Sequence, residues 1–210
     1  MDNITIFKTL VGSRLWNMQR EDSDYDYFEC YLLPTEEYLV GRDDKSSQKM
    51  KGEDDVAKHE AGIVVKGLLS GNINFFIGVL GKPIMTTDEF WELRKIVENN
   101  KARNVYKSVN GLSVRNYKKY VEGNENPKEK KVKLVLRTLE LGINYYDTGK
   151  FIFEKPSYFD KMSKEDLITQ IDIKVKELED KYKESKFPES LPEKELKNWL
   201  LKTRLKYLNK

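Results

Sequence analysis

Two strand-like segments joined by a polar connection most constrain how this chain can fold. Residues 4–11 are apolar and rich in β-branched side chains, and this segment ends at Gly12 and Ser13. Residues 25–33 form a second strand-like segment, aromatic and partly alternating, which follows directly after Asp24. The N-terminal part of the chain is therefore expected to form a small β-rich unit.

The connection between these segments has the properties of a phosphate-binding turn. Residues 13–18 are expected to form one or two helical turns directly after the first strand. The N–H groups at a helix start lack intrahelical partners, so together with the Ser13 hydroxyl they can hold phosphate oxygens. Gly12 lets the backbone approach such a group closely.

Two carboxylates stand next to this turn in the sequence. Asp24 and Asp26 are two residues apart at the start of the second strand, and residues with this spacing project from the same face of a strand. Two such charges repel unless a cation lies between them, and hard divalent cations, above all Mg²⁺, suit oxygen ligands. A phosphate cradle beside a carboxylate pair indicates a site for a metal-bound nucleoside triphosphate.

The rest of the chain is mainly helical. Residues 41–55 are expected to form an exposed polar loop, and a short strand is expected at residues 55–59. Helical spacing or capping signals then predict helices near residues 60–69, 86–94, 105–121, 129–147, 163–185 and 193–208. The predicted class is α+β, with a small N-terminal mixed β-sheet core and helices followed by a C-terminal helical bundle.

Composition excludes several classes of protein. The 38 Lys and Arg residues nearly balance the 35 Asp and Glu residues, so the net charge of +3 neither requires nor excludes a polyanionic partner. Cys30 is the single cysteine, which rules out an intrachain disulfide and favours a reducing compartment. One histidine, His59, cannot form a histidine-rich zinc site. No apolar run approaches the roughly 18 residues of a membrane span, so we expect a cytoplasmic protein without membrane contact.

The motif resembles a known superfamily. The order Gly-Ser, about ten residues, then Asp-x-Asp is similar to the signature of the DNA-polymerase-β-like nucleotidyltransferases, and in particular of the branch of RNA-ligase-associated polymerase-like predicted nucleotidyltransferases. The residues in register are Gly12, Ser13, Arg14, Trp16, Ser23, Asp24 and Asp26. Asn17 stands where the branch usually has Gly, and Asn is the next best residue for a positive φ angle.

Further blocks of the branch follow downstream. The branch has an Asp, four residues, a Glu, an apolar helix and an Asn-x-Asn segment, which correspond here to Asp55, Glu60, residues 61–69 and residues 72–74. The third metal-binding carboxylate would be Asp55. Asp54 remains the alternative, because a slip of one residue reverses the face to which a strand residue points.

The resemblance has gaps. The branch often has a Glu shortly after the Asn-x-Asn segment, where this chain has Ile77 or Gly78. The similarity covers roughly residues 4–150, and no counterpart is identified for residues 156–210. It implies a catalytic core at residues 1–80, a helical subdomain completing the active-site cleft at residues 81–150 and a charged helical extension at residues 151–210.

The resemblance implies a mechanism. Two Mg²⁺ ions, with Mn²⁺ as the alternative, would bind Asp24, Asp26 and Asp55, which are the expected catalytic and metal-binding residues. The expected nucleotide-binding residues are Gly12, Ser13, Arg14, Lys131, Lys133 and Arg137. A nucleoside triphosphate such as ATP would donate a nucleoside monophosphate to a hydroxyl group, first of all at an RNA or tRNA end. The alternatives are a catalytically silent nucleotide- or nucleic-acid-binding protein, or an enzyme that nucleotidylates a protein or a small molecule.

Overall fold

The computed structural model of the chain describes residues 3–40, 48–50 and 54–208. They divide into two compact units. The first, which we call the sheet unit, consists of Met1–Lys101 and Ser190–Lys210, and the second, the helical unit, consists of Ala102–Glu189. The predicted α+β class is confirmed, with a mixed sheet in the N-terminal part and helices after it.

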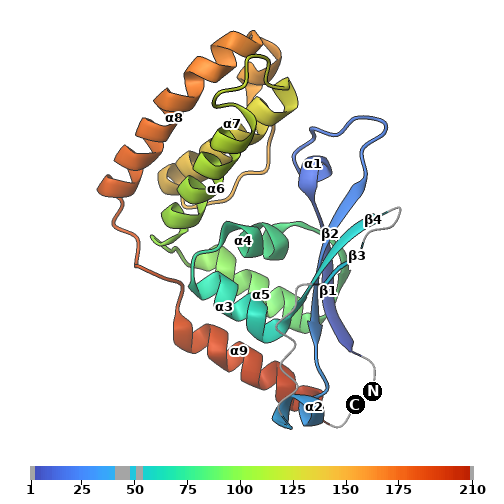
Figure 1. The fold of residues 1–210 in the computed structure, drawn as a ribbon. Helices are drawn as coiled ribbons and strands as arrows, with labels where there is room; N and C mark the ends of the chain where they lie inside the picture. Colours follow the sequence, from blue (N-terminus) through green and yellow to red (C-terminus); the bar gives the residue numbers. More distant parts are fainter. Residues whose placement is uncertain (1–2, 41–47, 51–53, 209–210) are drawn as a thin grey trace. The chain divides into compact units, whose positions relative to one another are not determined.

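The sheet has five strands in the described residues, in the order β3-β4-β2-β1-β5 (Figure 1). Their bounds are Ile4–Val11 for β1, Tyr25–Leu32 for β2, Gln48–Met50 for β3, Asp54–Glu60 for β4 and Lys82–Thr86 for β5. β1 runs antiparallel to β2 and β5, β4 runs parallel to β2, and β3 pairs antiparallel with β4. The predicted strands near residues 4–11, 25–33 and 55–59 are thus present.

Alternation along β2 separates the two faces of the sheet. Phe28 and Cys30 are buried, and burial raises the pKa of the Cys30 thiol well above its usual value. The Phe28 ring lies 4.8 Å from the His59 ring and 5.9 Å from the Phe75 ring, measured between centroids. Burial also lowers the pKa of His59, so this half-buried side chain is neutral at pH 7 and packs against the Phe28 ring.

Two of the helices of the sheet unit, α3 and α4, begin at side chains that cap them. The bounds are Gly12–Leu15 for α1, Thr35–Leu39 for α2, Ala61–Leu69 for α3, Ile73–Leu80 for α4, Asp88–Asn99 for α5 and Glu193–Lys206 for α9. The Glu60 carboxylate accepts a hydrogen bond of 2.6 Å from the Gly62 amide at the start of α3, and the Asn72 side chain accepts one of 3.1 Å from the Asn74 amide at the start of α4. The Glu and the first Asn of the downstream motif therefore have structural roles as helix caps.

The last helix, α9, packs back onto the sheet unit. The Trp199 indole donates a hydrogen bond of 2.8 Å to the Glu89 carbonyl at the start of α5. The Arg204 guanidinium lies 2.5 Å from the Glu60 carboxylate, and both side chains are buried. Lys206 forms a second ion pair with the Glu89 carboxylate. Residues near the C-terminus thus hold the start of α3 and the start of α5 in place.

The helical unit is built around α7. Its helices are α6 at Val105–Tyr120, α7 at Glu129–Thr148 and α8 at Lys164–Glu184, with a 3₁₀ turn at Ser157–Asp160. α7 packs against both α6 and α8. The Tyr145 hydroxyl accepts a hydrogen bond of 2.6 Å from the Ala102 amide, which anchors the start of the unit to α7. None of the helices in the described residues is long and apolar enough to cross a membrane.

The units differ from the three predicted segments. The sheet unit extends past residue 80, because α5 packs against β1, β5 and α4. Residues 151–210 do not form one extension, because α8 packs on α7 whereas α9 packs on α3 and α5. β5 and α2 were absent from the expected elements. Within the predicted loop at 41–55, residues 48–50 are in a strand, and 41–47 and 51–53 lie outside the described residues.

Gly78→Ala is expected to destabilise the protein by about 1–3 kcal/mol through overpacking. A β-carbon on Gly78 of α4 would lie 2.5 Å from the Phe28 ring, which also packs against His59 with 4.8 Å between the ring centroids. Gly111→Ala in α6 is the matched control, because a β-carbon there would meet no atom within 4 Å. The control should stabilise by up to about 1 kcal/mol through helix propensity. Urea unfolding measures the free energy of unfolding of both variants. If Gly78→Ala were as stable as Gly111→Ala, the packing of Phe28 against α4 would be contradicted.

Candidate active site

Two acidic residues face each other on neighbouring strands. Asp26 of β2 pairs in register with Asp55 of β4, and these two strands are parallel. Residues in register on adjacent strands project to the same side of a sheet. Both residues are half-buried. Their side chains therefore leave the sheet side by side, on the face where Phe28, two residues after Asp26, packs against α4.

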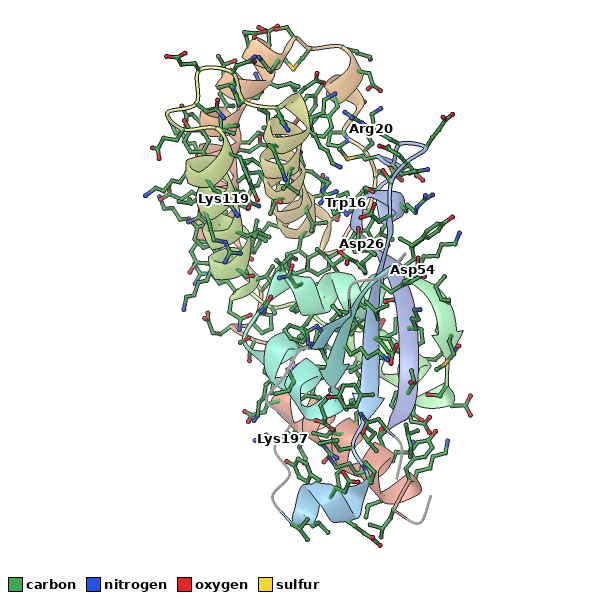
Figure 2. All side chains as sticks on the ribbon, turned by 45° about the vertical axis from the view of Figure 1, so that its right-hand side comes forward. Trp16, Arg20, Asp26, Asp54, Lys119 and Lys197 are labelled. Carbon is green, nitrogen blue, oxygen red and sulfur yellow. The ribbon has the colours of Figure 1, made fainter. Side chains whose placement is uncertain are left out.

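Asp54 belongs to the opposite face. It pairs in register with Tyr25, one residue before Asp26. The Tyr25 and Tyr27 rings are stacked with centroids 6.2 Å apart, so they share this second face. Asp54 therefore lies on the tyrosine face, and the pKa of Tyr27 is raised first by burial and then by the Asp54 charge. Figure 2 shows Asp54 and Asp26 at the same end of the sheet.

Gly12 leaves room for the Asp26 side chain. Val11, the last residue of β1, pairs with Asp26, so the chain turns out of β1 directly beside this carboxylate. Gly12 has a φ of 66°, and a β-carbon on it would overlap the Asp26 carboxylate. Gly is therefore required here for two reasons, the left-handed backbone conformation and the contact with Asp26.

The first helix is short and anchored by one aromatic ring. α1 follows Val11 directly and packs against β1 and β2. Trp16 is buried, whereas Ser13 is partly exposed in the first turn. The turn after α1 passes through Asn17 with a φ of 54°, as expected for an Asn in place of Gly. The buried Trp16 thus fixes a turn that presents Ser13 at the end of the strand that pairs with Asp26.

Arg14 restrains the segment that carries Asp24. Its guanidinium donates hydrogen bonds of 2.6 Å to the Ser23 carbonyl and 3.3 Å to the Asp24 carbonyl. It also lies 3.8 Å from the centroid of the Tyr25 ring. The Ser23 hydroxyl in turn accepts a hydrogen bond of 2.8 Å from the Arg20 amide. Arg14 and Ser23 therefore order the backbone just before β2.

The carboxylates Asp24, Asp26 and Asp55 do not form a complete set of metal ligands in this structure. Asp24 is exposed and lies just before β2. Within the described residues, no three acidic, histidine or cysteine side chains come together closely enough to hold a metal ion. The structure brings together Asp26 and Asp55, with Asp24 two residues away along the chain. A pair of adjacent carboxylates can bind a hard divalent cation while leaving coordination positions for phosphate oxygens and water.

The remaining expected nucleotide-binding residues lie in the helical unit. The Lys131 ammonium lies 4.3 Å from the centroid of the Tyr120 ring. Lys133 forms an ion pair with Glu129 one turn earlier in α7. Arg137, one turn after Lys133, is half-buried. The site described here is therefore built from the sheet unit alone.

Reasoning from the sequence did not assign a role to Arg14 as a backbone clamp or to Glu60 as the partner of Arg204. The signal for Glu60 was its place directly before an apolar helix, which is typical of a capping residue. Of Ile77 and Gly78, the two positions at which the branch often has Glu, Gly78 has no space for a side chain because of its contact with Phe28.

Comparison with known protein families assigns the chain to one of them. Residues 2–199 match the model of the RlaP family, which is described as an RNA repair pathway DNA polymerase beta family. The match continues well past residue 150, so residues 156–199 do have a counterpart in the family, against the expectation from the motifs. No curated protein matches the sequence. The chain belongs to the RlaP family of polymerase-β-like nucleotidyltransferases of an RNA repair pathway.

Proposed function

We propose that the protein is a metal-dependent nucleotidyltransferase that transfers a nucleoside monophosphate from a nucleoside triphosphate to a hydroxyl group at an RNA or tRNA end. The observation that carries the proposal is the pairing of Asp26 with Asp55 beside the Gly12 turn. The strands position the two carboxylates next to the turn in which Ser13 is partly exposed. Membership of an RNA repair family supports RNA as the acceptor.

The donor set fits a divalent cation. Asp26 and Asp55 supply oxygen ligands only, which suits Mg²⁺ or Mn²⁺ better than softer metals. Two carboxylates at adjacent register positions repel each other, and a shared cation removes this repulsion. When bound, divalent ions would neutralise the triphosphate and activate the attacking hydroxyl. Asp24, two residues before Asp26, would supply a further oxygen ligand.

In this proposal the site residues of the sheet unit have distinct roles. Asp26 and Asp55 hold the charge that binds the metal–triphosphate complex. Gly12 keeps the space next to Asp26 clear, and Ser13 and nearby amides donate hydrogen bonds to the phosphates. The acceptor oxygen forms a bond to the α-phosphorus as the bond to the bridging oxygen of the β-phosphate breaks. Pyrophosphate leaves, and the hydroxyl proton passes to solvent.

Transfer of the α-phosphate tests the proposal. The protein is incubated with each of the four ribonucleoside triphosphates, labelled at the α-phosphate, together with Mg²⁺ or Mn²⁺, total RNA and total protein. Label is expected on RNA, with release of pyrophosphate, and should disappear in Asp26→Asn. Label on protein instead would identify a protein-modifying enzyme. Absence of label and pyrophosphate from folded protein would contradict the proposal.

Arg14→Ala is expected to lower kcat by about ten- to a hundredfold, because misplaced reacting groups cost a comparable factor. Its KM for the triphosphate should change little, because the guanidinium binds the Ser23 and Asp24 carbonyls and so acts as a positioning residue. Arg14→Lys should also be impaired, because an ammonium cannot reproduce the two-pronged donor and the stacking on Tyr25. Steady-state kinetics with the exposed Arg20→Ala as a charge-matched control measure this. A rise in KM at unchanged kcat would instead indicate direct phosphate binding.

A further inference from the structure

One face of α6 is strongly basic. Residues 99–121 contain no acidic residue, and the nearest carboxylates in the sequence are Glu98 and Glu122. On α6 itself Lys107, Arg115 and Lys118 are exposed, whereas the opposite side of the helix packs into the helical unit. Lys107 and Lys118 are 11 residues apart, which corresponds to about 16 Å along a helix axis. The face is long enough to meet several neighbouring negative charges.

Several other cations of the same unit are paired with carboxylates. On α7 and α8, Lys133, Lys174, Lys181 and Lys183 each form an ion pair with a carboxylate. In the part of the chain that the structure describes, Lys107, Arg115 and Lys118 form no ion pair with any carboxylate. The positive charge on α6 is therefore not neutralised by the protein's own described residues.

Gly111 lies in the middle of this face. Glycine weakens a helix interior, because it loses more conformational freedom than alanine and exposes the backbone. Packing does not require it here, because a β-carbon on Gly111 would meet no atom within 4 Å. Gly111 therefore provides a flat, open stretch of helix between Lys107 and Arg115, where another backbone can approach closely.

An aromatic side chain stands at the end of the same helix. The Tyr120 ring lies 5.0 Å from the Lys119 ammonium and 4.3 Å from the Lys131 ammonium, measured to its centroid. The pKa of its hydroxyl is lowered by these cations, mainly by a hydrogen bond from Lys119. Figure 2 labels Lys119 on this part of the helix. A ring between cations is typical of surfaces on which bases stack while phosphates meet the charges.

We propose that the exposed face of α6, defined by Lys107, Gly111, Arg115 and Lys118, binds the sugar–phosphate backbone of RNA. The proposal rests on the proposed function, since it names the surface that holds the RNA acceptor outside the carboxylate site. Unneutralised cations favour a polyanion, and the open position at Gly111 favours close approach of a backbone. Contacts to phosphates do not depend on base sequence, so this surface holds RNA without selecting its sequence.

Binding of RNA without catalysis tests the inference. Fluorescence anisotropy of a fluorescein-labelled single-stranded RNA is measured in EDTA, over a range of salt concentrations. The variant Lys107→Ala/Arg115→Ala/Lys118→Ala is compared with wild type and with Lys161→Ala/Lys176→Ala/Lys186→Ala, which removes equal charge from exposed sites in the same unit. Each phosphate contact to a single strand contributes about 0.7 to the slope of the logarithm of the binding constant against the logarithm of the salt concentration. Loss of three such contacts corresponds to about a hundredfold weaker RNA binding at about 0.1 M salt. The control should stay within about threefold of wild type.

A second variant separates shape from charge. Gly111→Leu keeps the charge and adds bulk at the open position, so weaker RNA binding at unchanged helix content is expected. Equal binding by wild type, the α6 triple variant and its control would overturn the inference, even if label transfer to a short acceptor proceeds normally. Loss of binding specific to the α6 variants would support it, even if no nucleotide were transferred. The two proposals can therefore fail separately.

Discussion

Asp26→Asn is expected to reduce nucleotidyl transfer by at least about a thousandfold, because the residue would lose the charge that holds the metal–triphosphate complex. Bound metal ions supply several kcal/mol of charge stabilisation in the transition state. About 4 kcal/mol of such stabilisation corresponds to about a thousandfold in rate. The amide is nearly isosteric with the carboxylate, so the contact with Gly12 is kept and the fold should not change. Pyrophosphate release under saturating triphosphate measures the loss.

Neighbouring aspartates provide the control for this prediction. Asp55→Asn should match the loss seen in Asp26→Asn, because the two residues are register partners on adjacent strands. Asp54→Asn removes the same charge one residue away, on the face that carries Tyr25 and Tyr27, and should retain activity within about threefold, as expected for a surface substitution away from the site. Loss of activity in Asp54→Asn with normal activity in Asp55→Asn would contradict the assignment of the two faces.

Arg204→Met is expected to destabilise the protein by about 3–5 kcal/mol, because it leaves the buried Glu60 charge without its partner. The Glu60 side chain is 5% exposed and the Arg204 side chain 10% exposed, so water cannot replace the lost interaction. The guanidinium also covers the Tyr38 ring, at 4.0 Å from its centroid. Urea unfolding followed by circular dichroism measures the change.

Two controls distinguish burial from ion pairing as such. Lys202 lies on α9, as Arg204 does, and pairs with Glu92 of α5; the two side chains are 70% and 47% exposed. Lys202→Met breaks this exposed pair and should cost less than about 1 kcal/mol. The double variant Glu60→Gln/Arg204→Met removes both charges, and a glutamine oxygen can still accept from the Gly62 amide. It should recover much of the lost stability, because replacing a buried ion pair by neutral groups is often tolerated. A double variant as unstable as Arg204→Met would show that packing of Arg204, rather than its charge, is what matters.

Local sequence signals predicted the central elements of the sheet unit. The apolar residues at 4–11 and 25–33, together with the short strand before Glu60, became β1, β2 and β4. The amphipathic stretches after residue 100 became α6, α7, α8 and α9 close to their expected bounds. The positive φ of Asn17 also followed from its residue type. In these cases a short window of sequence contained the physical cause.

Features that depend on distant residues could not be predicted. Asp54 and Asp55 are adjacent in the sequence, and only the register of β4 against β2 separates their faces. Glu60 and Arg204 are 144 residues apart, so nothing local indicated that α9 returns to the sheet unit. β5 is short and contains Pro83, which weakens any strand pattern, and it forms only by pairing with β1.

Binding of Mn²⁺ shows whether Asp26 and Asp55 form a metal–nucleotide site. Isothermal titration calorimetry measures Mn²⁺ binding to the protein saturated with a nonhydrolysable triphosphate analogue, in wild type, Asp26→Asn, Asp55→Asn and Asp54→Asn. Wild type and Asp54→Asn are expected to bind the ion with similar affinity. Binding beyond that of the free analogue is expected to be lost in Asp26→Asn and in Asp55→Asn. Equal Mn²⁺ binding by all four proteins would contradict the proposed site.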